Sequence, residues 1–70
     1  MTALDPIRRA QYSALEKHRE ALREVLMRRR VYQRWVDEGR MSTATAEDKI
    51  AIMQEIADEY EQAAKKGRLL

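Results

Sequence analysis

The 70-residue chain contains no cysteine, no phenylalanine, one histidine, one proline and two glycines. Without cysteine it cannot form a disulfide, and one histidine cannot make a metal site alone. No apolar run approaches the ~20 residues of a membrane-spanning helix, and the N-terminus lacks the apolar segment of a signal peptide. We therefore expect a soluble, cytoplasmic protein that does not enter a membrane.

The sequence also lacks the patterns that catalysis requires. It has no Gly-rich phosphate loop, no metal-ligand spacing and no serine near the histidine on a recognisable turn. We expect a protein without enzymatic activity, without a bound metal and without a cofactor.

A chain of this length forms a single domain, here residues 1–70. One core in so short a chain buries only about 60% of the surface that the unfolded chain exposes. Small natural domains supplement such a core with disulfides, a metal or self-association. Because the sequence offers neither of the first two, we expect self-association.

Charge is distributed unevenly along the chain. Residues 1–40 hold ten Arg and Lys and six Asp and Glu, whereas residues 41–70 hold four and six. Opposite net charges favour packing of the two halves on each other and place an anion-binding surface on the first half. Most of these charges also fit ordinary solvated helix faces.

Few residues interrupt the helical pattern. Asp5 and Pro6 are typical of a helix start, and Gly39 tolerates the positive φ found just past a helix end. These signals predict a first helix over about residues 6–38.

Ser42 is a good N-cap, and Gly67 is a stop signal, so a second helix is expected over about residues 43–66. The predicted fold class is all-α, a two-helix antiparallel hairpin. At ~1.5 Å per residue the arms would be about 50 and 36 Å long. The longer arm would leave residues 6–17 without a partner in the same chain, unless that segment is frayed.

Apolar residues recur at helical spacing in both arms. The first arm carries one stripe, whereas the second carries two, and a helix with a single partner needs only one. We expect one stripe of the second helix to pack on the first helix and the other to pack on a neighbouring subunit, in a homo-oligomeric helical bundle. The stripes are Leu15, Leu22, Val25, Tyr32 and Val36 with Leu26 at the edge; Ala46, Ile50, Met53, Ala57, Tyr60 and Ala64; and Ile52, Ile56 and Ala63.

The oligomer interface would use the apolar residues of the overhang and the second stripe. A lone histidine on an apolar stripe is more often a core or interface residue than a ligand. The expected interface residues are Ile7, Ala14, Leu15, His18, Ile52 and Ile56.

Residues 27–36, MRRRVYQRWV, contain four arginines, a tyrosine and the chain's single tryptophan. This run contains no aspartate or glutamate. Arginine binds phosphate or carboxylate through a planar fork of donors, and an aromatic ring can stack on a base. The run therefore indicates an anion or nucleotide site. The candidate ligand-binding residues are Arg28, Arg29, Tyr32, Trp35, Arg40 and Tyr60.

Arg29 falls at the centre of the first apolar stripe by helical spacing. A buried arginine without an anion costs several kcal/mol, so it requires a partner. That partner would be Glu55 or Glu59 of the second helix, or a ligand between subunits. The aromatic candidates have the plainer interpretation of core or interface residues, and Arg40 that of a solvated loop residue.

Four segments resemble a group of short, mostly uncharacterised phage and prophage proteins. The resemblance covers about residues 23–60, although members often have proline where this chain has Gln33 and an acid within residues 43–45. It implies an accessory protein acting in the cytoplasm of a bacterial host. The segments are 27–36 (MRRRVYQRWV), 39–42 (GRMS), 50–53 (IAIM) and 55–56 (EI).

The resemblance and the arginine run together favour one hypothesis. Some small helical phage proteins of this size form oligomers that sequester nucleotide signals of antiviral defence. By analogy, this chain would be a non-enzymatic homo-oligomer that binds a phosphorylated nucleotide between subunits. Arg28 and Arg29 would contact phosphates, and Tyr32 or Trp35 would stack on the base.

Two other hypotheses stay open, beside a structural role in the virion. One is a protein-interaction module that inhibits a host protein through the overhang or the second stripe. The other is weak nucleic-acid binding through Arg28, Arg30, Arg34 and Arg40. The modest net charge and the acidic second helix make nucleic acid the least favoured partner.

Overall fold

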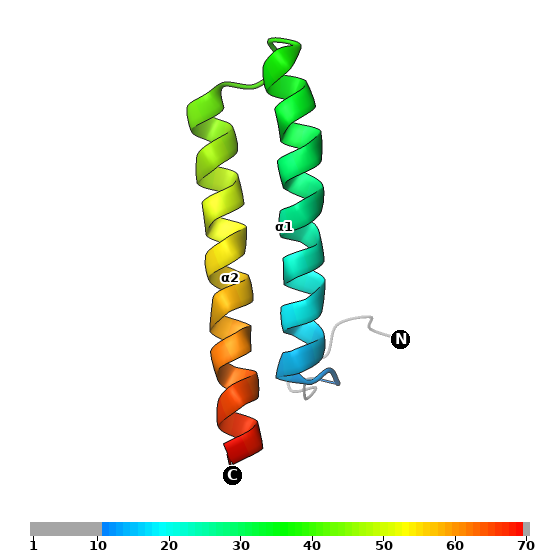
Figure 1. Ribbon diagram of the computed structural model, residues 1–70, viewed down its shortest axis with the longest axis vertical. Coiled ribbons are helices and arrows are strands. Elements are labelled where there is room, and N and C mark those ends of the chain that lie inside the picture. Colours follow the sequence, from blue (N-terminus) through cyan, green and yellow to red (C-terminus); the bar gives the residue numbers. More distant parts are fainter. Residues whose placement is uncertain (1–10, 70) are drawn as a thin grey trace, which may run out of the picture.

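The computed structural model describes residues 11–69. Two helices, α1 (Ala14–Asp37) and α2 (Thr43–Leu69), account for nearly all of this range, and it contains no strand. They lie side by side and run in opposite directions, joined at one end by residues 38–42 (Figure 1). The predicted all-α antiparallel hairpin is confirmed.

The start of α1 differs from the expectation. Residues 11–13 are not helical, so the helix predicted over 6–38 is wrong at its beginning. Ser13 accepts a hydrogen bond from the Glu16 N–H at 3.0 Å, and the Glu16 carboxylate accepts one from the Ser13 N–H at 3.2 Å. This capping box pairs two backbone donors that a helix start leaves free, which is why the helix begins here. Asp5 and Pro6 lie outside the described residues.

The end of α1 follows the glycine signal. Gly39 has φ +74°. Its N–H donates to the Val36 carbonyl at 3.0 Å, and the Arg40 N–H donates to the Trp35 carbonyl at 2.8 Å. These two bonds form a Schellman motif, which pairs carbonyls left free at the helix end and turns the chain toward α2.

The ends of α2 confirm one sequence signal and contradict the other. The Ser42 hydroxyl accepts from the Thr45 N–H at 3.1 Å, as an N-cap does. Gly67 does not stop the helix, which continues to Leu69. A glycine inside a helix costs only about 1 kcal/mol relative to alanine, so one glycine need not end it.

The two arms are nearly equal in length. With 24 and 27 residues they extend about 36 and 40 Å. We expected residues 6–17 to extend beyond the second helix, and for the described residues of this segment that prediction is wrong. Ala14 and Leu15 are half-buried, and the Lys17 ammonium lies 5.5 Å from the centre of the Tyr60 ring. Ile7, the other expected overhang contact, lies outside the described residues.

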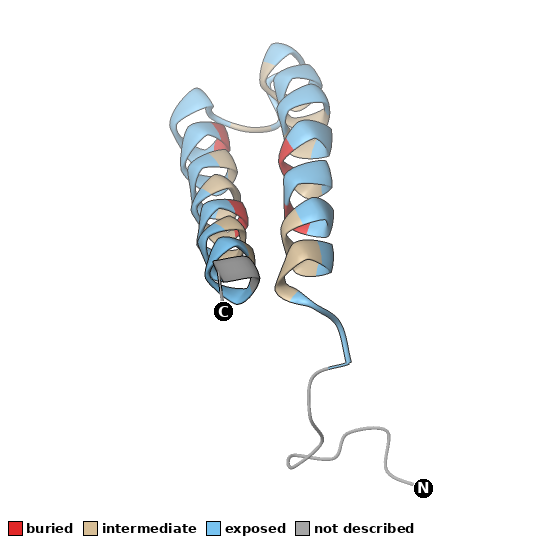
Figure 2. Cartoon of the chain, turned by 60° about the horizontal axis from the view of Figure 1, so that its bottom comes forward, coloured by how far each residue is buried: buried red, intermediate tan, exposed pale blue. Residues whose placement is uncertain are grey.

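The core is a narrow seam between the helices (Figure 2). Within the described part of the chain, the buried apolar residues are Ala21 and Val25 from α1 with Ala46 and Ala57 from α2. Small side chains let the backbones approach closely, but they bury little apolar area. The first stripe of α2 does pack on α1 as expected.

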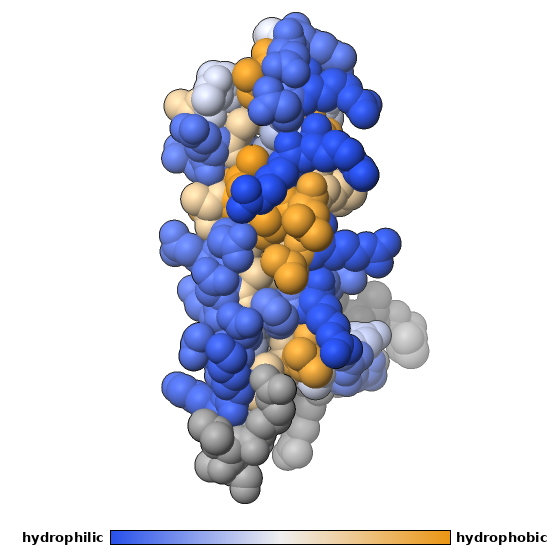
Figure 3. All heavy atoms as spheres, viewed as in Figure 1, coloured by the Kyte–Doolittle hydropathy of each residue, from blue (hydrophilic) through white to orange (hydrophobic). Residues whose placement is uncertain are grey.

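Apolar side chains outside this seam remain accessible, and Figure 3 shows apolar surface between charged side chains on the face in view. Ile52 of the second α2 stripe is 59% exposed, and Leu26 of α1 is 61% exposed. Ile56 is half-buried, and Ala63 is exposed. The second stripe therefore lacks full cover within the chain. Neither described helix is long and apolar enough to cross a membrane.

Candidate ligand-binding and interaction surfaces

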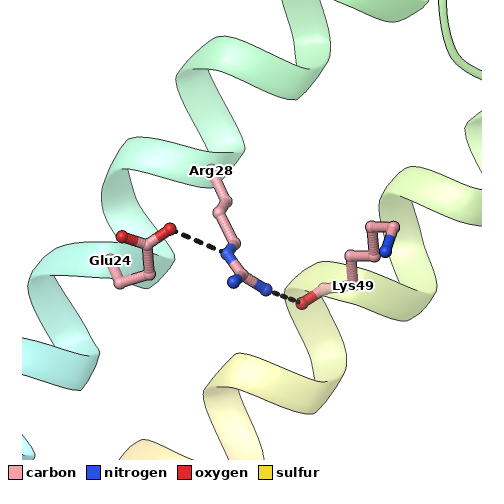
Figure 4. A network of polar contacts seen from close by, with 3 residues as sticks. All are labelled: Glu24, Arg28 and Lys49. Carbon is pink, nitrogen blue, oxygen red and sulfur yellow. Dashed lines mark hydrogen bonds and ion pairs between the residues drawn. The ribbon is translucent and has the colours of Figure 1, made fainter.

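Arg28 is held between the two helices (Figure 4). Its Nε donates to the Glu24 carboxylate at 2.8 Å, and its Nη1 donates to the Lys49 backbone carbonyl at 2.9 Å. The Glu24 pairing follows from their spacing of four residues on α1. Because its guanidinium group donates to a carboxylate of α1 and to a backbone carbonyl of α2, Arg28 links the two helices in this structure.

Arg29 is exposed, contrary to its expected place in the apolar stripe. Arg29 is four residues after Val25 and so only about 40° around the helix from it, which places its long side chain at the edge of the seam, where it extends to solvent. Among residues 11–67, no ion pair joins Arg29 to Glu55 or Glu59. Within one chain, the expectation that Arg29 is buried and paired with Glu55 or Glu59 is wrong, and a ligand between subunits stays a prediction. Its side chain instead borders a groove of about 170 Å³ lined also by Tyr32, Gln33, Val36, Thr43, Ala46, Glu47 and Ile50.

An aromatic cluster occupies the closed end of the hairpin. The rings of Tyr32 and Trp35 are stacked, with centroids 5.6 Å apart and planes 28° apart. The Arg40 guanidinium carbon lies 5.2 Å from the Trp35 centroid, and Arg40 also pairs with Glu38 at 3.3 Å. That ion pair is exposed and therefore weak. We call Tyr32, Trp35 and Arg40 the tip cluster.

Tyr60 and His18 lie toward the other end of the hairpin. Tyr60 is covered by the ammonium of Lys17, as stated above. His18 is half-buried and directs Nδ1 at the Ala57 carbonyl oxygen, 2.8 Å away, so this nitrogen donates within the chain. The plainer expectation for a lone histidine, a hydrogen-bonded position in the packing, fits this contact.

The six expected ligand-binding residues do not converge in one chain. The tip cluster unites three of them, whereas Arg28 is held at mid-hairpin, Arg29 borders the groove described above and Tyr60 contacts Lys17. No single site within one chain therefore contains all six residues.

A second groove, which sequence reasoning missed, lies over the seam beside Ile56. It measures about 310 Å³ and combines apolar side chains from both helices with charged side chains at its border. The second apolar stripe of α2 indicates one side of this groove. The residues of α1 that form its other side follow only from the register of the two helices. The lining residues are Lys17, Glu20, Ala21, Glu24, Met53, Ile56 and Tyr60.

The described residues contain no cluster of three or more His, Asp or Glu side chains that could hold a metal ion. Comparisons of the chain with protein-family models, curated proteins and solved structures give no match. The candidate surfaces therefore have to be interpreted from their own chemistry.

Proposed function

We propose that the protein is a non-enzymatic interaction module that binds a helix of a partner protein. The observation that carries this proposal is the 59% exposure of Ile52 beside the groove at Ile56. We call Ile52, Met53, Ile56 and this groove the Ile52 face. Covering an isoleucine fully is worth about 1.5–3 kcal/mol, so the face gains stability when an apolar surface packs on it.

The Ile52 face has the composition of a helix-binding groove. Met53 and Ile56 form an apolar centre, and Lys17, Glu20 and Glu24 border it. An apolar centre with a charged rim is the usual anatomy of a specific protein interface. An amphipathic helix with apolar residues at intervals of three and four would fill it. In the phage setting that the sequence resemblance implies, the partner would be a bacterial protein that is inhibited when occupied.

Photocrosslinking in bacterial cells tests this function. A photoreactive amino acid at position 52 should give one discrete adduct with a bacterial protein, and the same probe in place of exposed Arg34 should not. The identified protein, once purified, should bind the chain, and Ile56→Asp should weaken that binding at least tenfold. Adducts with the chain itself only, or equal adducts from both positions, would rule the function out.

The tip cluster favours a second candidate function, the sequestration of a phosphorylated nucleotide. Trp35 and Tyr32 provide aromatic surface, and the weak Arg40–Glu38 pair can exchange for a phosphate. Arg28 is left out of this site because it is bonded within the chain.

Native mass spectrometry of protein purified from bacterial cells tests this second function. A stoichiometric extra mass that is released on denaturation and lost in Trp35→Ala would support it. Retention of the same mass by Trp35→Ala, or no extra mass and no thermal shift with millimolar nucleotides, would exclude the tip cluster as the site.

A further inference from the structure

A stripe of leucine and arginine side chains follows α1 on the side away from the Ile52 face. Its members are separated by four and three residues in turn, which keeps them in line on a helix. Leu22 and Leu26 are 37% and 61% exposed, and Arg29 borders the 170 Å³ groove on this side. We call it the leucine–arginine stripe; it comprises Leu15, Arg19, Leu22, Leu26 and Arg29.

A matching acidic stripe follows α2 on the same side of the hairpin. Glu47 borders the groove that Arg29 also borders, which places both stripes beside each other. The Gln54 amide donates to the Asp58 carboxylate at 3.0 Å, so these two residues share a face. The stripe has the same alternating spacing, with three acids and no base; it comprises Glu47, Ala51, Gln54, Asp58 and Glu61.

Three contacts fix which residues of α1 and α2 lie at the same level. His18 meets Ala57, Arg28 meets Lys49, and Lys17 meets Tyr60. By interpolation along two antiparallel helices, Arg29 is level with Glu47, Leu22 with Gln54 and Arg19 with Asp58. Each arginine of one stripe therefore has an acid of the other at its own height.

We propose that a second copy of this chain packs on this side of the hairpin, so that α1 of each copy lies antiparallel on α2 of the other in a four-helix bundle. A two-fold axis parallel to the hairpin preserves the level of every residue. Arg29 then faces the partner's Glu47, and Arg19 faces the partner's Asp58. Leu22 and Leu26 pack on the partner's Gln54 and the partner's Ala51. Each contact occurs twice.

The alternative two-fold arrangement is unfavourable. If α1 packed antiparallel on the partner's α1 with Leu22 opposite the partner's Leu26, Arg19 would lie opposite the partner's Arg29. Like charges at the same height repel, whereas α1 on α2 places Arg29 and Arg19 opposite the partner's Glu47 and the partner's Asp58. The charge pattern therefore selects one packing. This inference goes beyond the proposed function, because the Ile52 face lies on the other side of the hairpin and stays open in the dimer.

Charge reversal tests the interface, with sedimentation and native mass spectrometry as readouts. The unmodified chain should be a dimer, and Arg29→Glu and Glu47→Arg should each weaken dimerisation at least tenfold. Mixing the two variants should restore a dimer of mixed mass, because both inter-chain pairs are then opposite in charge. Arg29 and Glu47 also border one groove within a chain, but only a partner copy can relieve the repulsion by mixing.

Two further variants complete the test. Arg34→Glu makes the same charge change at an exposed α1 position outside both stripes and should stay dimeric. Leu26→Glu alters a side chain that is 61% exposed, so it should remain helical by circular dichroism and become monomeric. A monomeric unmodified chain, a dimeric Leu26→Glu variant, or charge-reversed variants that stay apart on mixing would overturn the proposal.

Discussion

The Nδ1 atom of His18 lies 2.8 Å from the backbone carbonyl oxygen of Ala57 and joins α1 to α2 across 39 residues of sequence. Ala57 is fully buried, which lets the imidazole come close to the α2 backbone. Arg28 makes the corresponding bond to the Lys49 carbonyl two to three turns away. Two side chains of α1 thus donate hydrogen bonds to the backbone of α2, and together they fix the register of the hairpin.

Replacing His18 with leucine should lower the free energy of unfolding by about 1 kcal/mol, because a hydrogen bond between the helices is lost. His18→Asn should cost less, since its side-chain N–H₂ can donate from near the position of Nδ1. Urea denaturation, followed by circular dichroism at one protein concentration, checks this. Equal stability of the leucine variant and the unmodified chain would show that the bond contributes nothing.

Local signals were sufficient to predict the hairpin itself. Gly39 and Ser42 lie at the turn, and each acts through backbone bonds to residues close in sequence. Such short-range chemistry can be interpreted without knowledge of the rest of the fold. The start of α1 is harder to predict, because Pro6 is also a helix-start signal, whereas α1 begins at the capping box formed by a serine and a glutamate three residues apart.

Ser13→Ala should destabilise the protein by about 1 kcal/mol if the capping box starts α1. Glu16→Gln keeps a side-chain oxygen that can accept from the Ser13 N–H, so it should cost less. Hydrogen exchange of the first α1 amides should accelerate in Ser13→Ala and change little in Glu16→Gln. Unchanged protection in Ser13→Ala would mean that α1 does not depend on this cap.

The site was harder to predict than the fold, because it depends on which line of α1 faces α2. The apolar stripe was centred near Arg29, but the helices approach most closely along Ala21 and Val25. Arg29 is only about 40° around the helix from Val25, but at the edge of so narrow a seam a long charged side chain extends to solvent. Arg28 lies on the other side of Val25 and reaches the α2 backbone, through a bond that no sequence pattern indicates.

The two glycines should respond oppositely to alanine. Gly39→Ala should lower the unfolding free energy by about 1–2 kcal/mol, since a Cβ is strained at φ +74°. No atom lies within 4 Å of the added Cβ, so this cost comes from the backbone alone. Gly67→Ala should raise stability by up to about 1 kcal/mol, because Gly67 is helical. Chemical denaturation of both variants checks the opposite signs; equal signs would contradict the assigned conformations.

Arg28→Lys should lower the unfolding free energy by about 1 kcal/mol, because a single ammonium cannot reproduce the geometry with which the guanidinium reaches Glu24 and Lys49. Arg30→Lys, at an exposed position of the same helix, is the matched control and should change stability little. Any nucleotide that co-purifies with the chain should be retained by Arg28→Lys. Loss of nucleotide without loss of stability would instead make Arg28 a ligand contact.

Val25 and Leu26 are adjacent in sequence but differ fully in environment, with 1% and 61% exposure. Val25→Ala should destabilise the hairpin by about 2 kcal/mol at every protein concentration, because it opens space in the seam.

Leu26→Ala should change stability by less than about 0.5 kcal/mol at concentrations where the chain is monomeric. It should lower the thermal midpoint only where copies associate, because the lost contact then belongs to the dimer. Thermal denaturation over a hundredfold range of concentration separates these effects, and a cost of Leu26→Ala that is independent of concentration would place Leu26 in the fold of the single chain.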